Sequence, residues 1–464
     1  MTHDILIIGS GPAGMSAAVT AKSLGLKVAL IDEQQRAGGQ IYRDVAVVSD
    51  SAGRILGPDY LYGKTLVKAL EDVDVEHHFA TTVWDVAPDL TVSALKAGQS
   101  FQLRAPQIIL ATGAMERSSP ITGWTLPGVL SAGAAQIAMK GSGSVPSGRI
   151  VLVGGGPLLL LVACQLIDAG ANVVAIVETS PSSTWRKALR HLTGALMSPK
   201  LLAKGLVLIA RLKMAGVPWF KAVTELRVEG VDRAEAVCFT CAGKLHRIEA
   251  NAVLLHHGVV SNTQMTRLLQ VQHDWNAAQL AWQPCQDVFG QTSQKGVRVA
   301  GDGGGISGSI AAEASGTLAA LGAAHALGRI SQDQRDNLAR APNRVLHAER
   351  RIRPFLDALY CPPDWITAPS GSTIVCRCEE VTAEQIAGMT KLGCLGPNQT
   401  KFFSRCGMGP CQGRVCGLAV TAILARELGK TPDLVGAFRI RSPLKPIPLA
   451  ALARHIPLTT GNAQ

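Results

Sequence analysis

Charged residues are scarce in this chain of 464 residues, at 17%, and they form no long block. Lysine and arginine exceed aspartate and glutamate by 11 charges, yet the longest basic run is Arg350-Arg351. A basic balance can attract nucleic acid, anionic cofactors or an acidic partner subunit. Because nucleic-acid binding usually needs a clustered basic segment, we do not expect nucleic acid as a partner.

Long apolar runs are also missing. The stretch from Pro157 to Ile167 is too short to span a bilayer, and residues 201–212 are interrupted by Lys204 and Arg211. We expect no transmembrane helix. The N-terminus enters an apolar strand at once, without the features of a secretory signal, so we expect a cytoplasmic location and leave peripheral membrane contact open.

The motifs of hydrolytic enzymes are absent as well. The sequence contains no HExxH motif, no Ser-His-Asp order and no paired carboxylates that stand out. Hydrolysis is therefore not expected, and the sequence names no catalytic residue.

Glycine, in contrast, is abundant, with 48 residues, and 47% of the chain is hydrophobic. This composition is typical of a compact α/β protein with many tight turns between strands and helices. The length predicts two or three domains.

The first nucleotide-binding pattern lies at the N-terminus. An apolar strand over 4–8 is followed by Gly9-Ser10-Gly11-Pro12-Ala13-Gly14, a helix over 12–24 and a strand over 27–31. These glycines permit close approach of a pyrophosphate to the helix N-terminus, and an acid after the second strand can bind ribose. Asp32 is that acid, with its neighbour Glu33 as the alternative.

Three further segments are expected at the same site. Gly38, Gly39 and Gln40 offer open backbone and an amide to an isoalloxazine ring. A buried strand over 107–110 leads into Ala111-Thr112-Gly113, and a strand over 297–300 leads into Gly301 and Asp302. Asp302 can accept a hydrogen bond from a ribityl hydroxyl or can cap the following helix.

A second strand-turn-helix unit occupies residues 149–178. Gly154, Gly156 and Pro157 form its turn, Glu178 is the downstream acid, and Leu159 stands where the third glycine belongs. A bulky residue there pushes the helix away from the strand. The unit therefore allows two interpretations, a site for NAD(P) or another adenine nucleotide and a purely structural fold.

Six of the 11 cysteines lie between Cys376 and Cys416. Such clustering in a cytoplasmic chain points to a metal site, and Cys376 and Cys378, one residue apart in an extended segment, point to the same side. Four thiolates suit a 2Fe-2S cluster or tetrahedral zinc. Cys406 and Cys411 have the same spacing as Cys411 and Cys416, and Cys394 is expected to pack in a core.

Other polar features carry weaker expectations. Cys238 and Cys241 lie in a predicted hairpin and are expected to serve packing rather than dithiol chemistry. His256 and His257 end a strand and receive no assigned role. A helix is predicted over 343–360, and its basic face is either a docking surface or a solvated one.

Several segments together resemble the FAD oxidoreductases with two dinucleotide-binding domains. More narrowly, they are similar to the α subunits of opine oxidases, hydrogen cyanide synthases and heteromeric proline or hydroxyproline dehydrogenases. The stretches are GSGPAG at 9–14, IDEQQRAGGQIYR at 31–43, ATGAMER at 111–117, PGV at 127–129 and VAGDGGG at 299–305. The cysteine segment resembles a 2Fe-2S domain of the bacterioferritin-associated ferredoxin type.

The resemblance implies an α/β fold with two Rossmann-like domains, the second inserted in the first, and a small C-terminal α-helical iron-sulfur domain. The implied domains are 1–118 with 259–340 for FAD, 119–258 for the NAD(P)-like fold, 341–370 for a helix and linker, 371–437 for the cluster and 438–464 for a tail. It assigns the cluster to Cys376, Cys378, Cys411 and Cys416, with Cys406 as the rival.

The resemblance also implies an enzyme subunit that passes electrons through FAD and a 2Fe-2S cluster. Its partner would be a β subunit, similar to FAD-dependent amino-acid oxidases, that oxidises an opine, proline, hydroxyproline or glycine. A small γ subunit and an FMN at a subunit interface are further implied alternatives. Two competing interpretations are a self-contained NAD(P)H-dependent reductase and a nucleotide-binding scaffold with zinc.

Overall fold

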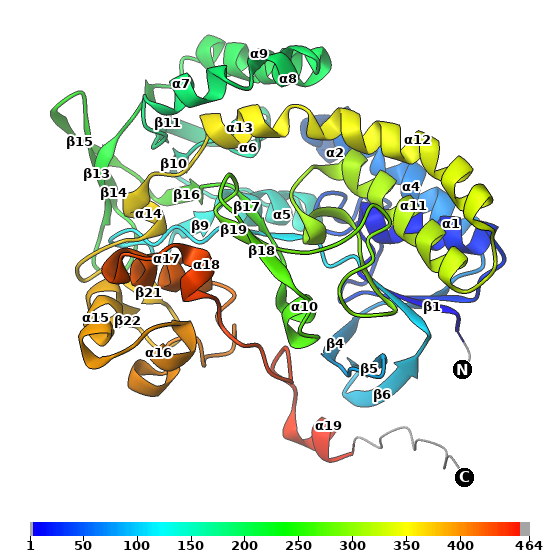
Figure 1. Cartoon of the computed structure of the whole chain (residues 1–464). Coiled ribbons are helices and arrows are strands. Elements are labelled where there is room, and N and C mark those ends of the chain that lie inside the picture. Colours follow the sequence, from blue (N-terminus) through cyan, green and yellow to red (C-terminus); the bar gives the residue numbers. More distant parts are fainter. Residues whose placement is uncertain (1–2, 455–464) are drawn as a thin grey trace.

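The computed structural model describes residues 3–454 and contains two parallel sheets with a smaller helical unit beside them (Figure 1). The first sheet has the order β20-β7-β1-β2-β3, and its strands are parallel. Their bounds are Ile5–Ile8 for β1, Val28–Ile31 for β2, Glu76–His78 for β3, Gln107–Leu110 for β7 and Val297–Val299 for β20. The central strands read as continuous apolar runs because both faces of the sheet are covered.

Side chains alternate between the two faces of β1. Ile5 and Ile7 pack with helices α1 (Pro12–Ser23), α4 (Gly63–Glu71) and α11 (Ser309–Ala326). On the other face, Leu6 and Ile8 pack against the antiparallel sheet formed by β4 (Thr81–Val86), β5 (Thr91–Lys96) and β6 (Gln99–Arg104). Each face of the sheet thus has its own hydrophobic core.

The second parallel sheet has the order β12-β11-β10-β16-β9. Its strands are β9 (Val129–Ser131), β10 (Arg149–Gly154), β11 (Asn172–Glu178), β12 (Trp219–Phe220) and β16 (Ala252–His256). Helices α5 (Ala132–Ser142), α6 (Pro157–Asp168) and α9 (Pro199–Met214) accompany it. All of these elements lie between β7 and β20 in the sequence, so the second nucleotide fold is inserted in the first, as predicted.

Two antiparallel ribbons and a three-stranded sheet complete these folds. The ribbon of β8 (Ala114–Glu116) and β17 (Val259–Ser261) joins the segments that enter and leave the inserted fold. The second ribbon pairs β18 (His273–Asn276) with β19 (Ala281–Pro284). The three-stranded sheet contains β13 (Thr224–Glu229), β14 (Ala236–Cys241) and β15 (Lys244–Glu249).

The helix predicted over 343–360 is wrong in its bounds. The structure has two helices there, α12 (Gln332–Arg350) and α13 (Arg353–Leu359). The prediction began after Pro342, but α12 continues through that proline because a capping box of Ser331 and Gln334 starts it earlier. Pro342 removes one internal hydrogen bond without ending the helix.

A small C-terminal unit follows, with a core of its own. It contains the short pair β21 (Ile374–Cys376) and β22 (Val381–Thr382), then α15 (Ala383–Met389), α16 (Pro397–Ser404), α17 (Gly417–Leu428) and α18 (Pro432–Val435). In Figure 1 this unit lies far from α8 (Leu192–Leu196) and α9, which form the opposite end of the molecule. Within residues 3–454, every helix is too short or too polar to cross a bilayer.

Candidate functional site

The first glycine-rich turn connects β1 to α1 and leaves no room for side chains at two positions. Gly9 has φ +105°, and a Cβ there would lie 2.3 Å from the carbonyl oxygen of Ala111. A Cβ on Gly14 would lie 1.8 Å from the carbonyl oxygen of Gly9. Gly11 precedes Pro12, the first residue of α1, and a Cβ there would meet no atom closer than 3.9 Å. The helix N-terminus therefore presents open backbone to a phosphate.

Segments far apart in the sequence meet at this turn. A Cβ on Gly39 would lie 2.7 Å from the Cα of Gly11, so the Gly38-Gly39 segment packs directly on the phosphate turn. A Cβ on Gly301 would lie 2.9 Å from the Cβ of Ala13. The structure thus brings the predicted residues after β1, β2, β7 and β20 to one edge of the sheet.

Asp32 and Glu33 point to different partners. Asp32 turns back onto the phosphate turn, where its Oδ2 accepts hydrogen bonds from the backbone N and the Oγ of Ser10 at 2.6 and 2.8 Å. Its Oδ1 accepts a hydrogen bond from the amide of Gln34 at 2.7 Å. Glu33 instead forms an ion pair with Lys445 of the C-terminal tail. Asp32 therefore holds the turn, and Glu33 is the more exposed carboxylate beside it.

The backbone carbonyl of Gln40 contacts a buried lysine that the sequence did not single out. Lys140 of α5 donates to that carbonyl at 3.2 Å and to Oε1 of Gln136 at 2.9 Å. Burial lowers the pKa of Lys140 to about 7, and the nearby charge of Arg43 adds to the effect. The side chain of Gln40 is exposed and accepts a hydrogen bond from Arg43 at 2.9 Å.

The segments after β7 and β20 are fixed by hydrogen bonds across the site. The Oγ1 of Thr112 donates to the carbonyl of Asn262 at 3.3 Å, and the carbonyl of Gly113 accepts from the amide of Asn262 at 3.0 Å. Asp302 uses Oδ1 to accept hydrogen bonds from the amides of Ser307 and Gly308, at 2.8 and 3.1 Å. The capping interpretation of Asp302 therefore matches the structure, since these amides lead into α11.

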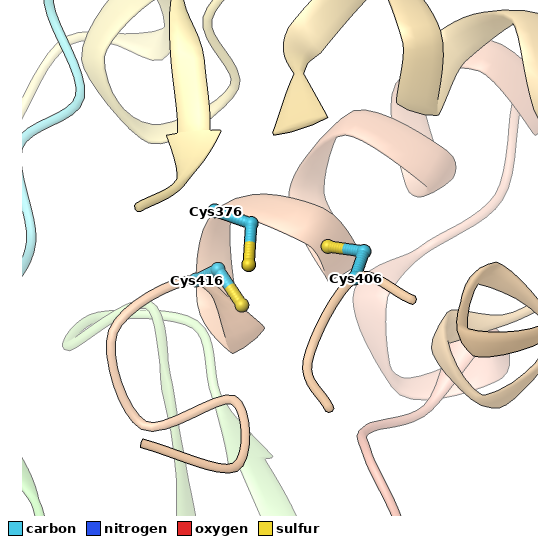
Figure 2. Close-up of side chains that lie close together, drawn as sticks. All are labelled: Cys376, Cys406 and Cys416. Carbon is cyan, nitrogen blue, oxygen red and sulfur yellow. The ribbon is translucent and has the colours of Figure 1, made fainter. Parts of the chain in front are cut away.

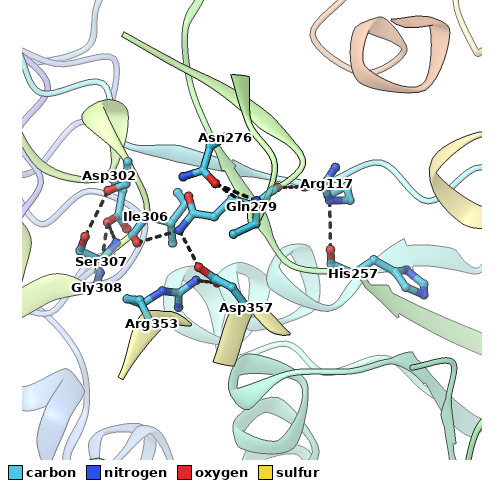
Figure 3. Close-up of polar contacts among 12 residues, drawn as sticks. Arg117, His257, Asn276, Gln279, Asp302, Ile306, Ser307, Gly308, Arg353 and Asp357 are labelled. Atoms are coloured by element: carbon cyan, nitrogen blue, oxygen red, sulfur yellow. Dashed lines mark hydrogen bonds and ion pairs between the residues drawn. The ribbon is translucent and has the colours of Figure 1, made fainter. Parts of the chain in front are cut away.

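A polar network that the sequence did not reveal runs from this loop toward the second fold (Figure 3). Gln279 donates to the carbonyl of Ile306 at 3.2 Å and to Asp357 at 3.1 Å. Arg117 is fully buried and donates to the carbonyls of Gln279, Leu280 and His257. Burial lowers the pKa of Arg117 to about 10. The network ties the segments that enter and leave the inserted fold to each other.

The second glycine-rich turn has the same backbone but a different surrounding. Gly154 has φ +127°, and a Cβ there would lie 1.8 Å from the carbonyl oxygen of His256. Gly156 precedes Pro157 at the start of α6. Leu159, at the position of the third glycine, is buried in the hydrophobic core. The turn keeps the shape of a nucleotide-binding turn without its third glycine.

Tyr360, which follows α13, covers this turn. Its ring lies 3.3 Å from the position of a Cβ on Gly155. Burial raises the pKa of Tyr360 to about 12, with a smaller contribution from the charge of Glu178. Glu178 is itself largely buried and accepts a hydrogen bond from Trp219 at 2.9 Å, and desolvation raises its pKa. The end of α13 therefore occupies the space beside both predicted nucleotide contacts.

Figure 2 shows that the sulfur atoms of three cysteines point toward one another. The Sγ atoms of Cys376, Cys406 and Cys416 all lie within 4.8 Å of one another, and all three residues are buried. Hydrogen bonds from Cys406 and Cys416, together with the backbone amides of Gly407 and Glu379, lower the pKa of Cys376. A partly ionised thiol group in a protein core is well suited to bind a metal.

The other two cysteines of the predicted set form a pair at the surface of the same unit. The Sγ atoms of Cys378 and Cys411 lie 3.7 Å apart, and Cys378 is exposed. A Cβ on Gly409 would lie 2.2 Å from the Cβ of Cys378, so a glycine is needed for this approach. The structure thus separates the four predicted ligands into two pairs and places Cys406 with Cys376 and Cys416.

The remaining sulfur and imidazole groups have structural surroundings. Cys394 is buried in the C-terminal core and its Sγ donates to the carbonyl of Gly396. Cys238 and Cys241 lie in the hairpin of β14 and β15, three positions apart and hence on opposite faces of the strand. His256 lies 2.6 Å from a carboxylate oxygen of Glu116. These placements match the expectation that the groups serve packing.

Comparisons with known proteins agree with this geometry. Residues 3–316 match the family described as pyridine nucleotide-disulphide oxidoreductase, and residues 370–455 match the sarcosine oxidase A3 domain. The opine oxidase A subunit of Rhizobium meliloti is 43% identical over 97% of this chain and 87% of that protein. The chain belongs to the family of opine oxidase A subunits. This membership makes the opine oxidase A-type chain a FAD-dependent oxidoreductase and one component of a heteromeric flavoprotein.

More distant relatives of this opine oxidase A-type chain are subunits as well. Hydrogen cyanide synthase subunit HcnB of Pseudomonas protegens is 31% identical over 97% of each chain. The solved structure of L-proline dehydrogenase from P. horikoshii has a TM-score of 0.71 over 98% of this chain and 80% of that one. At 19% identity, it supports the fold alone.

Proposed function

We propose that this chain is the electron-transferring subunit of a dehydrogenase or oxidase whose β subunit oxidises an amine-type substrate. The substrate class would be an opine, proline, hydroxyproline or glycine, in keeping with the names of the relatives. The observation that supports the proposal is one chain with two redox-type sites, the open phosphate turn at Gly11 and the thiol group at Cys376, Cys406 and Cys416. A flavin exchanges electrons singly or in pairs and an iron-sulfur cluster exchanges single electrons.

At the flavin end, the chain's own residues bind and orient. The amides at the start of α1 face the pyrophosphate, and Asp32 holds the turn through Ser10. We infer that Glu33 is free to accept a ribose hydroxyl when its ion pair with Lys445 opens. Gly38 and Gly39 exclude side chains from the face that the ring would approach.

At the thiol end, we propose a 2Fe-2S site held by Cys376, Cys378, Cys411 and Cys416. Cys406 is the alternative ligand because its sulfur is grouped with those of Cys376 and Cys416. Backbone amides at Gly407 and Glu379 contact the sulfur of Cys376, and hydrogen bonds of this kind tune the potential of a cluster.

A second candidate function is a self-contained NAD(P)H-dependent reductase. It requires an open nucleotide site at Gly154 and Glu178, whereas Tyr360 lies on that turn. A third candidate, from another class, is a scaffold with zinc at the four sulfurs. We favour the electron-transferring role over both, and we propose an FMN at the subunit interface and a small γ subunit for the complete assembly.

Anaerobic purification followed by metal and sulfide analysis tests the proposal. We expect a flavin spectrum together with about two iron atoms and two sulfides per chain, the content of a 2Fe-2S site. Zinc without visible absorbance beyond the flavin would contradict the electron-transfer proposal and favour the scaffold. Rapid bleaching of the flavin by NADH would favour the reductase.

A further inference from the structure

The segment 179–224 contains eight basic residues and no acidic residue. It forms α7 (Thr184–Leu189), α8 and α9, which lie at the end of the molecule away from the cysteine unit (Figure 1). The basic residues of these helices and their connections are Arg186, Lys187, Arg190, Lys200, Lys204, Arg211 and Lys213. Within residues 3–454, carboxylates pair only with Lys204 and Arg211 of this set, through Asp59 and Asp168.

The same helices expose large apolar side chains to an unusual degree. Met214 is 87% exposed, Leu206 66%, Leu196 62% and Met197 61%. Trp185 of α7 is 53% exposed. Single exposed apolar residues are common, but a group of this size on adjacent helices marks a surface that binds something.

The apolar and basic residues of α9 are sorted around the helix. Leu208 and Leu212 face the core. On the outer face, Leu206, Val207 and Met214 share one arc because of their spacing, and Lys200, Lys204 and Arg211 follow its edge. An exposed apolar arc bordered by basic residues is the pattern of a helix that lies in the plane of a membrane interface.

We propose that α7, α8 and α9 form a membrane-docking surface for a bilayer with anionic headgroups. Anionic lipid presents a uniformly negative surface, which complements a segment without any carboxylate. Long lysine and arginine side chains reach the headgroups while their stems and the apolar arc contact the acyl boundary. A protein interface fits less well, because lysine is depleted in such interfaces and several lysines lie here. The proposal does not depend on the electron-transfer function.

Co-sedimentation of the full FAD-loaded chain with vesicles tests this surface. We expect binding to mixed phosphatidylcholine and phosphatidylglycerol vesicles at low salt, weaker binding at high salt, and little binding to pure phosphatidylcholine. Replacing Lys200 and Lys213 by glutamate should reduce the partition coefficient by about fivefold or more for each change. The matched control carries Lys391→Glu and Lys430→Glu in the C-terminal unit and should bind as the parent does.

A second variant tests the apolar arc. Leu196→Ser, Leu206→Ser and Met214→Ser together should abolish vesicle binding while FAD content and thermal midpoint stay unchanged, since these side chains are mostly exposed. Leu245→Ser, Val288→Ser and Leu434→Ser remove comparable exposed apolar groups elsewhere and should leave binding intact.

Three results would overturn the proposal. One is a parent chain that does not bind phosphatidylglycerol vesicles, and another is equal binding by the parent and the serine variant. The third is loss of assembly with the β subunit in the serine variant without loss of vesicle binding, which would assign the surface to a partner protein.

Discussion

The ring of Tyr360 lies against Gly155, so the end of α13 covers the turn at which a second pyrophosphate would bind. This contact joins a residue after the inserted fold to the first turn of that fold. It makes the second nucleotide site the part of the molecule whose ligand-binding capacity is easiest to test.

We expect the isolated chain to show no rapid reduction of its flavin by NADH or NADPH. Tyr360→Ala removes the ring from Gly155 and should produce measurable binding of NADH or ADP-ribose by titration calorimetry. Tyr360→Phe keeps the ring and serves as the control, so it should behave as the parent. Fast reduction of the parent flavin in stopped-flow measurements would show that the ring is not a barrier.

Gly39→Ala should cause loss of FAD during purification. The new Cβ would lie 2.7 Å from the Cα of Gly11 and would displace the phosphate turn. Gly25→Ala is the matched control, because Gly25 also has a positive φ but a Cβ there meets nothing within 4 Å. The control should lose about 1 kcal/mol of stability from backbone strain and keep its FAD. Released flavin per chain, measured by absorbance, separates the two outcomes.

Single cysteine replacements should identify the ligands of the cluster. Cys376→Ser is expected to abolish iron and sulfide binding, because its sulfur belongs to both the predicted set and the buried group. Iron content in Cys406→Ser and Cys411→Ser then distinguishes the two alternatives, since only the true ligand should lose most of its iron. Cys394→Ser is the control and should retain iron. Full iron content in Cys376→Ser would contradict the site.

Unfolding should depend on pH partly through His257, which is buried between Ser119 and Thr179. Burial lowers the pKa of His257 to about 3 from 6.5, so the unfolded chain binds a proton that the folded chain excludes. The contribution is complete above pH 6.5 and is lost as pH falls toward 3, by about 1.4 kcal/mol per pH unit.

The variant His257→Gln should therefore lose less stability than the parent between pH 6 and pH 4. Urea unfolding, followed at both values, measures the difference. The exposed His191→Gln is the control and should follow the parent. An unchanged slope in His257→Gln would mean that the imidazole is protonated without unfolding.

The first nucleotide fold could be predicted from the sequence because its signals are local. Strands β1 and β2, helix α1 and the turn at Gly9 and Gly14 follow from apolar runs and glycine spacing within a short segment. The approach of Gly301 to Ala13 was expected only in outline, because it joins two distant segments.

Contacts between distant segments could not be predicted. Nothing in the local pattern around Tyr360 indicates that it covers Gly155, and nothing around Lys140 indicates burial beside Gln40. The grouping of Cys406 with Cys376 also depends on how α16 and α17 pack, which spacing along the chain does not determine. Such contacts arise from tertiary packing rather than from propensity.

The position of β20 beside β7 has a consequence for synthesis of the chain. The ribosome must complete the inserted fold before the last strand of the first sheet exists. During that interval, the edge of β7 is exposed and can pair wrongly, whereas the inserted fold has all of its strands. We therefore expect the second nucleotide fold to mature first and the FAD site to form only after Val299 has left the exit tunnel.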